Sequence, residues 1–170
     1  LMGPIEELHA VVETVHRERG GVTGKNDDQA TLQLKFASGV SGSIYVSRVS
    51  TGRKMGYAYQ IDGTKGAIRF DGEDQNAIWL YLREGPDAEQ GFRKILTGPA
   101  HPDYLPFCQG PGHGTGYQDQ IIIEAKDFLT AIEAGESQWP TFHEGMEVNR
   151  VVTAAHASSN SRSWVRLSDF

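Results

Sequence analysis

Apolar and polar residues alternate along much of the first half of the chain, and this pattern predicts β-strands. In Ala30–Phe36 every second residue is apolar and the residues between are polar, which is typical of a strand with one buried face. Ser38-Gly39 then predicts a turn, and apolar residues continue over 40–46 on a returning strand. We therefore expect a β-hairpin over residues 30–46.

Similar alternation predicts further strands on both sides of this hairpin. A tight turn at Gly63–Gly66 joins two of them. The polar segment Arg17–Asp28 is predicted to be a turn or mobile loop, and the Gly- and Pro-rich segment Gly85–Gly116 a long ordered loop. The predicted strands are Ile5–His16, Tyr57–Ile61, Ala67–Phe70, Ile78–Leu82 and Trp164–Leu167.

A first helix is predicted after the long loop. Thr115 and Gln118 have the spacing of a capping box, in which each side chain satisfies a free backbone N–H group. Gly135 is placed to end this helix. Apolar residues recur between these points at helical spacing: Ile121, Ala125, Phe128, Leu129 and Ile132.

A second helix follows, with Thr141 and Glu144 as its capping box and Ser158–Ser161 as its predicted stop. Its apolar stripe consists of Met146, Val151, Val152 and Ala155. Many strands, then two helices, then one more strand predict the α+β class. We expect one domain over residues 1–170, in which the helices pack on one face of a mostly antiparallel sheet and the open face is available for oligomerisation.

Charge and cysteine content narrow the function classes. The net charge is −6 and no block of Lys and Arg stands out, which argues against nucleic-acid binding because phosphates require a basic face. Cys108 is the only cysteine; it can form neither an internal disulfide nor a zinc cluster, which fits a reducing, cytoplasmic compartment. No apolar run approaches the about 18–20 residues of a membrane span.

The glycine-rich run Gly110–Gly116 is similar to a phosphate-binding loop, but its context does not fit one. A dinucleotide fingerprint follows a strand directly within a βαβ unit, whereas the preceding His101–Pro106 is not strand-like and no P-loop lysine follows. We therefore expect no cofactor-binding residue in this chain. The run ends at a predicted helix start, where free N–H groups favour an anion or a hydroxyl-rich ligand.

Two segments carry side chains suited to a polar ligand. His113 and Tyr117 flank the predicted helix start and can hydrogen-bond such a ligand; alternatively, His113 is a solvated loop residue and Tyr117 packs on the core. Ser47–Tyr57 carries three cations that suit sugar hydroxyls or a carboxylate; alternatively, it is a solvated basic loop. His101 and Asp103 have metal-ligand spacing, but with no third ligand nearby no metal site is predicted.

Several motifs also follow one another in a distinctive order. They are Asp28–Phe36 with Ser38-Gly39, Asp62–Phe70, Gly116–Asp119 leading into Glu124–Leu129, and Pro140–Phe142 before Gly145 and Glu147. In this order they resemble the carboxy-terminal domain of the glucose–fructose oxidoreductase / inositol dehydrogenase (Gfo/Idh/MocA) family. The resemblance covers nearly the whole chain.

The resemblance implies a parent enzyme with an amino-terminal Rossmann domain that binds NAD or NADP and acts on a CH–OH group of a sugar or polyol. It places the family's proton-transferring groups, a Lys of a Glu-Lys-Pro motif and an Asp-x-x-x-His pair, outside this chain, so no catalytic residue and no activity are expected in the chain alone. It also implies that this domain closes the substrate pocket and pairs with another subunit through its open sheet face. The substrate-binding candidates at matching positions are Arg53, Lys54, Met55, His113 and Tyr117.

Two alternatives stay open. In one, the parent is a non-catalytic relative that acts as a redox regulator or sugar sensor, and the presence or absence of the Glu-Lys-Pro and Asp-x-x-x-His motifs would distinguish it. In the other, the chain is a free-standing sugar-binding or scaffold domain. The opening Leu1–Pro4 is similar to a helix end with a Gly-Pro stop, so we expect the chain to begin within a longer protein.

Overall fold

The computed structural model describes residues 2–108, 110 and 112–170, and the chain divides into two compact units. Unit 1 consists of Leu1–Thr51 and Trp139–Phe170, and unit 2 of Gly52–Gln138. Strands and helices occur as the α+β class requires, and every strand pairing in the described residues is antiparallel. The fold class predicted from the sequence is confirmed. That the two units act as one domain stays a prediction.

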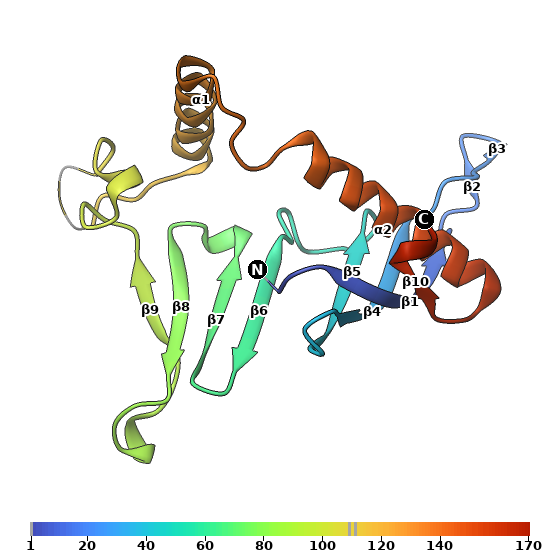
Figure 1. Ribbon diagram of the computed structural model, residues 1–170, viewed down its shortest axis with the longest axis horizontal. Coiled ribbons are helices and arrows are strands. Elements are labelled where there is room, and N and C mark those ends of the chain that lie inside the picture. Colours follow the sequence, from blue (N-terminus) through green and yellow to red (C-terminus); the bar gives the residue numbers. More distant parts are fainter. Residues whose placement is uncertain (1, 109, 111) are drawn as a thin grey trace. The chain divides into compact units, whose positions relative to one another are not determined.

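Unit 1 is built on a four-stranded sheet in the order β10-β1-β4-β5 (Figure 1). Strands β4 (Gln29–Phe36) and β5 (Ser41–Ser47) form the predicted hairpin, and its turn contains Gly39 at a φ of 83°, a conformation that favours glycine. Strand β1 (Ile5–Glu13) pairs with β4 on one side and with the closing strand β10 (Val165–Arg166) on the other.

The segment predicted to be a loop over Arg17–Asp28 contains a short ribbon. Strands β2 (Glu18–Arg19) and β3 (Val22–Thr23) pair with each other around Gly20 and Gly21, both at positive φ. Two-residue strands leave no alternation to detect, because the pattern needs at least four residues. The ribbon was therefore missed.

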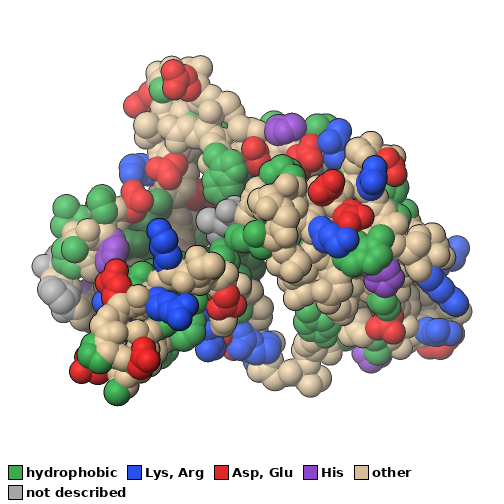
Figure 2. All heavy atoms as spheres, turned by 60° about the horizontal axis from the view of Figure 1, so that its bottom comes forward, with side chains coloured by type: hydrophobic (Ala, Val, Ile, Leu, Met, Phe, Trp, Pro, Cys, Tyr) green, Lys and Arg blue, Asp and Glu red, His purple; other side chains and the backbone are tan. Residues whose placement is uncertain are grey.

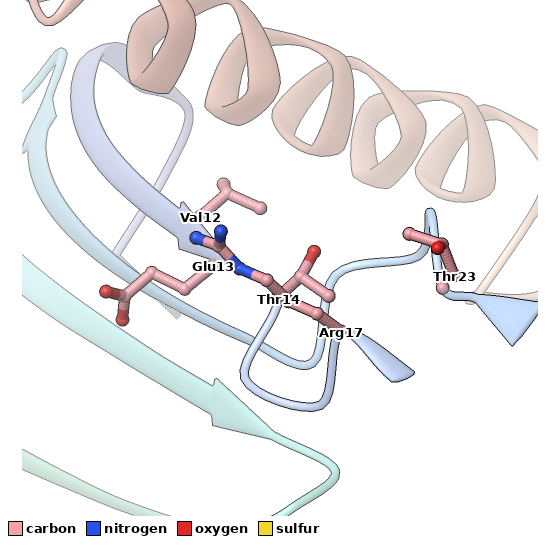
Figure 3. Close-up of a pocket in the computed structure, with 6 residues that line it drawn as sticks. Val12, Glu13, Thr14, Arg17 and Thr23 are labelled. Carbon is pink, nitrogen blue, oxygen red and sulfur yellow. The ribbon is translucent and has the colours of Figure 1, made fainter. Parts of the chain in front are cut away.

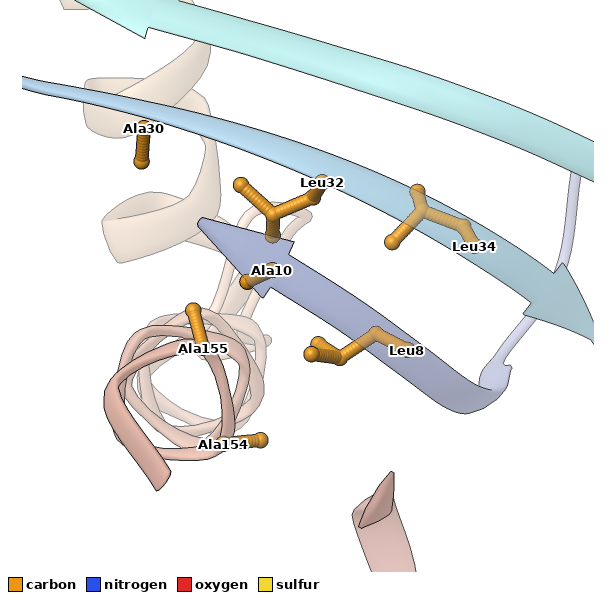
Figure 4. Packing of buried hydrophobic residues seen from close by; sticks show 7 residues of the cluster. All are labelled: Leu8, Ala10, Ala30, Leu32, Leu34, Ala154 and Ala155. Atoms are coloured by element: carbon orange, nitrogen blue, oxygen red, sulfur yellow. The ribbon is translucent and has the colours of Figure 1, made fainter. Parts of the chain in front are cut away.

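The core of unit 1 lies between the sheet and helix α2 (Phe142–Ser161), as Figure 4 shows. Leu8 and Ala10 of β1 and Ala30, Leu32 and Leu34 of β4 are buried against Ala154 and Ala155 of the helix. The predicted helix stripe was partly wrong, since Met146 and Val152 are about half exposed, at 46% and 51%. Two alanines on the buried face allow the helix to approach the sheet closely, and hydrophobic size alone does not reveal this.

The predicted start of α2 is confirmed, whereas its predicted end is not. At the start, the capping box is confirmed: the Thr141 N–H donates to Glu144 Oε2 at 2.7 Å, and Thr141 Oγ1 accepts from the His143 N–H at 3.1 Å. At the other end, the predicted stop at Ser158–Ser161 was wrong, because the helix includes these serines. It ends at Ser161, and Arg162, at a φ of 54°, is its C-cap.

Unit 2 contains a second antiparallel sheet, in the order β6-β7-β8-β9. The predicted strands appear as β6 (Ala58–Gly63), β7 (Gly66–Asp71) and β8 (Ala77–Leu82), and the short 3-10 helix η1 (Gly72–Asp74) connects β7 to β8. Strand β9 (Arg93–Leu96), η2 (Asp87–Glu89) and η3 (Pro102–Tyr104) lie inside the predicted long loop. Strand β9 was missed because its four residues, two cations followed by two apolar residues, show no alternation.

Helix α1 (Tyr117–Ala134) completes unit 2. It begins one residue later than predicted, because Gly116 is its N-cap and the Gly116 N–H donates to Asp119 Oδ2 at 2.7 Å. Gly135 ends it at a φ of 66°, as predicted. The expectation that its apolar stripe packs on the aliphatic sheet face is wrong for this structure: Ile121, Phe128 and Ile132 are 45%, 65% and 59% exposed.

Candidate functional site

The five predicted substrate-binding residues all lie in unit 2, in two segments. In the first, Arg53 is held by two carboxylates: its Nη2 lies 2.7 Å from Asp71 Oδ1 and its Nε 3.2 Å from Glu73 Oε2. The hydrogen bond to Asp71 raises the pKa of Arg53. Much of the donor capacity of this guanidinium is therefore used within the chain, which sequence reasoning did not predict.

Glu73 also fixes the backbone of this segment. Its Oε1 accepts from the N–H groups of Lys54 and Met55, at 2.6 and 3.1 Å. These two bonds, the Lys54 one first, lower the pKa of Glu73, because hydrogen bonds to a carboxylate favour its charged form. Among the described residues the Lys54 ammonium has no ion-pair partner. It can donate to a ligand.

The second segment contains His113 and Tyr117. His113 is exposed, and its Nδ1 lies 3.0 Å from the Gly110 carbonyl oxygen. Since a carbonyl oxygen only accepts, this contact places a proton on Nδ1 and leaves Nε2 free to accept from a hydroxyl when the ring is neutral. Tyr117, the first residue of α1, is 54% exposed, so the alternative in which it packs on the core is wrong.

Asn76, which sequence reasoning missed, anchors this second segment. Asn76 Oδ1 accepts from the Thr115 N–H and the Thr115 hydroxyl, both at 2.9 Å. It also accepts from the Thr97 hydroxyl, and the Thr97 N–H donates to the Asn76 carbonyl at 3.0 Å. The Asn76 and Thr115 positions are 39 residues apart, so no local pattern could have identified the pair.

The two segments are therefore held at one place, the connection from β7 to β8. Asp71 and Glu73 bind the residues 53–55, and Asn76 binds Thr115, two residues from both His113 and Tyr117. In the antiparallel register this connection lies at the end of the unit 2 sheet where β6 begins. Together they present an ammonium, an imidazole and a phenol, which suit a ligand rich in hydroxyl groups.

Two hollows occur elsewhere in the described structure. One, of ≈ 340 Å³, lies in unit 1 and is lined by Val12, Glu13, Thr14, Arg17, Thr23 and Gly24 (Figure 3). The other lies in unit 2 at the opposite end of the sheet, beside the Gly63–Thr64 turn, Tyr81 and Gln90. Neither is lined by a predicted site residue. All five predicted site residues are themselves exposed on this chain.

The described residues do not fit a dinucleotide or a metal. All strand pairs are antiparallel, so no βαβ unit is formed in this part of the chain, and the Asp119 carboxylate already caps the start of α1. His101 Nδ1 accepts from the Gly98 N–H, and Asp103 faces Lys126. Within residues 2–108, 110 and 112–170 no three His, Cys, Asp or Glu side chains gather as metal ligands would.

Charged side chains of both signs are interspersed on the face seen in Figure 2. On the described surface, oppositely charged side chains also pair, such as Lys35 with Glu7 and Lys94 with Asp74. This face carries no single basic patch of the kind that binds nucleic acid. Neither α1 nor α2 combines the length and the apolar character needed to cross a membrane, and the same is true of every other helix among the described residues.

Comparison with known proteins identifies relatives of this chain. A family profile described as GFO/IDH/MocA C-terminal domain matches residues 1–69. A levoglucosan dehydrogenase from Pseudarthrobacter phenanthrenivorans is 35% identical over 151 residues, which are 86% of this chain and 39% of the relative. The chain therefore spans less than half of that protein.

Solved structures of similar proteins extend the match to nearly the whole chain. A levoglucosan dehydrogenase in complex with NADH and levoglucosan has a TM-score of 0.91 at 33% identity, over 96% of this chain and 45% of that one. An NAD binding oxidoreductase from Klebsiella pneumoniae has a TM-score of 0.88 at 33% identity, with coverages of 96% and 45%. An oxidoreductase domain protein from Kribbella flavida has a TM-score of 0.86 at 35% identity, with coverages of 96% and 44%.

Proposed function

We propose a function that starts from the family of this chain, which belongs to the GFO/IDH/MocA family as a carboxy-terminal domain. The chain forms the substrate-binding part of an NAD(P)-dependent oxidoreductase that acts on a CH–OH group of a sugar or polyol, and it takes part in oligomerisation. The nucleotide belongs to another part of that protein, because the described residues here form no βαβ unit.

One observation carries the proposal: two donor-bearing segments are braced at the same end of the unit 2 sheet. A relative that shares this fold at a TM-score of 0.91 is a complex with NADH and levoglucosan, and another structure of that enzyme contains NADH and L-sorbose. Both sugars carry hydroxyl groups, which an ammonium, an imidazole and a phenol can hydrogen-bond.

Within this site each side chain has its own role. Lys54 donates to a hydroxyl oxygen, His113 accepts a hydroxyl proton at Nε2, and Tyr117 acts as donor or acceptor through its phenol. Met55, 49% exposed, supplies an apolar contact for ring carbons. Arg53 orders the segment through Asp71 and Glu73. All five side chains are exposed on this chain, so in this proposal the nucleotide-binding part completes the pocket.

The test is steady-state kinetics of the full-length protein on a panel of levoglucosan, L-sorbose, D-glucose and myo-inositol with NAD⁺ or NADP⁺. Lys54→Ala, His113→Ala and Tyr117→Phe are each expected to raise KM for the best sugar by about 2- to 10-fold, because each removes one hydrogen bond. The KM for the nucleotide stays within about two-fold. Lys65→Ala, in the β6–β7 turn at the other end of the sheet, is the matched control and leaves both constants unchanged.

The proposal is wrong if the wild type oxidises none of these sugars and binds none in calorimetry. It is also wrong in its placement of the site if the three variants behave like the control. The 170-residue chain alone is expected to bind neither nucleotide and to show no hydride transfer, and micromolar nucleotide binding in calorimetry would contradict the division of roles.

Oligomerisation is proposed through the face of the unit 1 sheet opposite α2. Val11 and Tyr45 are 48% and 60% exposed there, aligned with Thr31 between them. In unit 2, Trp79 and Tyr81 of β8 lie on one face of the sheet, and this face is partly covered. The Tyr81 hydroxyl bonds Gln90, the Phe92 ring centroid lies 6.3 Å from that of Tyr81, and Lys94 lies over Trp79. Exposed aromatic residues among polar ones are typical of interfaces, which favours the unit 1 face.

A further inference from the structure

The connection between β7 and β8 is short, yet it holds both segments of the proposed site. We propose that Glu73 and Asn76 are positioning residues, which set the placement of the Arg53–Met55 segment relative to the His113–Tyr117 segment and so determine how tightly a sugar is bound. This inference rests on the proposed function, because it assigns a role at the same site. In this proposal neither Glu73 nor Asn76 contacts the sugar itself.

On the Glu73 side, the carboxylate is the acceptor for two successive backbone N–H groups. Its bonds to Lys54 and Met55 fix the direction from which the Lys54 ammonium leaves the chain. The segment also passes directly over the connection: a Cβ at Gly72 would lie 2.8 Å from the Tyr57 carbonyl oxygen and 3.2 Å from Met55 Cγ. Glycine therefore allows the close approach, and Glu73 holds it.

On the Asn76 side, one side-chain oxygen accepts the Thr115 N–H and hydroxyl. Thr115 is 7% exposed, so these donors are largely shielded from water and would be left without a partner if Asn76 were removed. The same network includes Thr97 after β9, whose hydroxyl lies 3.0 Å from that of Thr115. The start of α1, with Tyr117, is thereby tied to the end of the sheet.

The connection itself is ordered. Asp71 Oδ1 accepts from the Glu73 N–H at 3.0 Å and caps η1, and the Ala77 that follows Asn76 is buried at 2% exposure. A ligand that contacts both segments then pays little conformational entropy for ordering them, because the fold has already done so. Loosening one anchor should weaken sugar binding without touching a sugar-binding group.

Asp74 offers a matched control on the same connection. Its carboxylate pairs with Lys94 Nζ of β9 at 2.5 Å, outside both segments, and both side chains are about 40% exposed. Asp74→Ala therefore removes an acidic side chain between Glu73 and Asn76 without removing either anchor. Exposed pairs of this kind contribute about 0–1 kcal/mol, so the control is expected to fold normally.

The first measurement is amide hydrogen exchange in the full-length protein without ligand. Asn76→Ala is expected to speed exchange at the Thr115 amide by at least about ten-fold and to leave the Lys54 and Met55 amides within about two-fold. Glu73→Ala should do the reverse, and Asp74→Ala should change neither. Exchange that stays slow at the Thr115 amide in Asn76→Ala, or at the Lys54 and Met55 amides in Glu73→Ala, overturns the anchoring.

The second measurement is KM for the best sugar of the panel. Glu73→Ala and Asn76→Ala should each raise it about 2- to 10-fold, with the nucleotide KM within about two-fold. Glu73→Gln and Asn76→Asp keep an oxygen acceptor, so the sugar KM of these variants should be close to the wild-type value. If the charge of Glu73 or the amide group of Asn76 were what matters, these variants would have a raised KM. If Asn76→Ala fails to fold, Thr115→Val replaces it in the test. This variant removes the hydroxyl donor and keeps the amide, so a smaller rise in sugar KM is expected.

The two proposals fail in different ways. Faster exchange with unchanged sugar KM, in a wild type that oxidises sugars, overturns the positioning role alone. A wild type that neither oxidises nor binds any sugar of the panel overturns the proposed function, and the positioning role with it. Raised KM in both alanine variants, with rescue by Glu73→Gln and Asn76→Asp and no change in Asp74→Ala, supports the inference.

Discussion

The backbone N–H of Ala10 donates a hydrogen bond to Ser158 Oγ at 2.9 Å, between two fully buried residues. Two residues along the strand, the Val12 N–H donates to Ser159 Oγ at 3.0 Å. Strand β10 pairs only with Glu7 and Leu8 of β1. Beyond that short pairing, serines of α2 accept from the edge of β1, and the helix completes the sheet with its side chains.

Ser158→Ala is expected to lower the free energy of unfolding by about 1–3 kcal/mol, because it leaves the buried Ala10 N–H without an acceptor. Chemical denaturation of the wild type and the variant measures the difference. Ser161→Ala, at an exposed position of the same helix, is the control and should lie within about 0.5 kcal/mol of wild type. Equal stability of the two variants would show that the Ala10 bond contributes nothing net.

Asp28 is expected to make stability depend on pH. Its buried carboxylate accepts from the N–H groups of His16 and Val15, both at 2.8 Å, and from Arg19, and the His16 bond is the largest cause of its lowered pKa. A folded pKa below the unfolded one gives stability that is fully present above the unfolded pKa of about 4 and is lost as pH falls through the folded pKa.

Asp28→Asn should therefore be less stable than wild type at neutral pH, and the difference should shrink as the pH falls below about 4. Denaturation at a series of pH values checks this. The control is Asp27→Asn. The Asp27 side chain is 49% exposed, so this variant should show the same dependence of stability on pH as the wild type. A constant difference between wild type and Asp28→Asn at all pH values would contradict the assignment.

Gly72→Ala is expected to displace the segment above the β7–β8 connection. The new Cβ would lie 2.8 Å from the Tyr57 carbonyl oxygen, and relieving such a contact typically costs about 1–3 kcal/mol. Thermal unfolding and amide exchange at Lys54 report the change. Gly91→Ala, where a Cβ meets no atom within 4 Å, is the control. A Gly72→Ala variant as stable as Gly91→Ala would contradict the close approach at Gly72.

Tyr45→Lys is expected to weaken self-association if the unit 1 face is the interface. A charge in the interface core is costly to bury, whereas Trp79→Lys, on the partly covered face of unit 2, should have a smaller effect. Sedimentation of the full-length protein at tens of micromolar distinguishes them. A monomeric wild type removes the interface, and a dimer lost only in Trp79→Lys moves it to unit 2.

Local pattern was enough where a structure depends on neighbours in sequence. The alternation of Ala30–Phe36 predicted β4, and Gly135 and the Thr141–Glu144 pair predicted helix boundaries that the structure confirms. Pattern was insufficient at Thr115, which has the spacing of a cap but bonds Asn76 instead. A tertiary partner outcompeted the local one, and the Asp119 carboxylate took over the cap.

By itself, the sequence determined the α+β class, most of the strands and the family, because these depend on periodicity, turn chemistry and the order of motifs along the chain. It also predicted candidate sugar-binding side chains. Only the tertiary structure decided the long-range hydrogen bonds: Glu73 with the Lys54 N–H, Asn76 with Thr115, and Ser158 with the Ala10 N–H. Each of these pairs is separated by 19 to 148 residues, and a hydrogen bond across such a distance leaves no periodic trace, because its geometry exists only once the chain has folded.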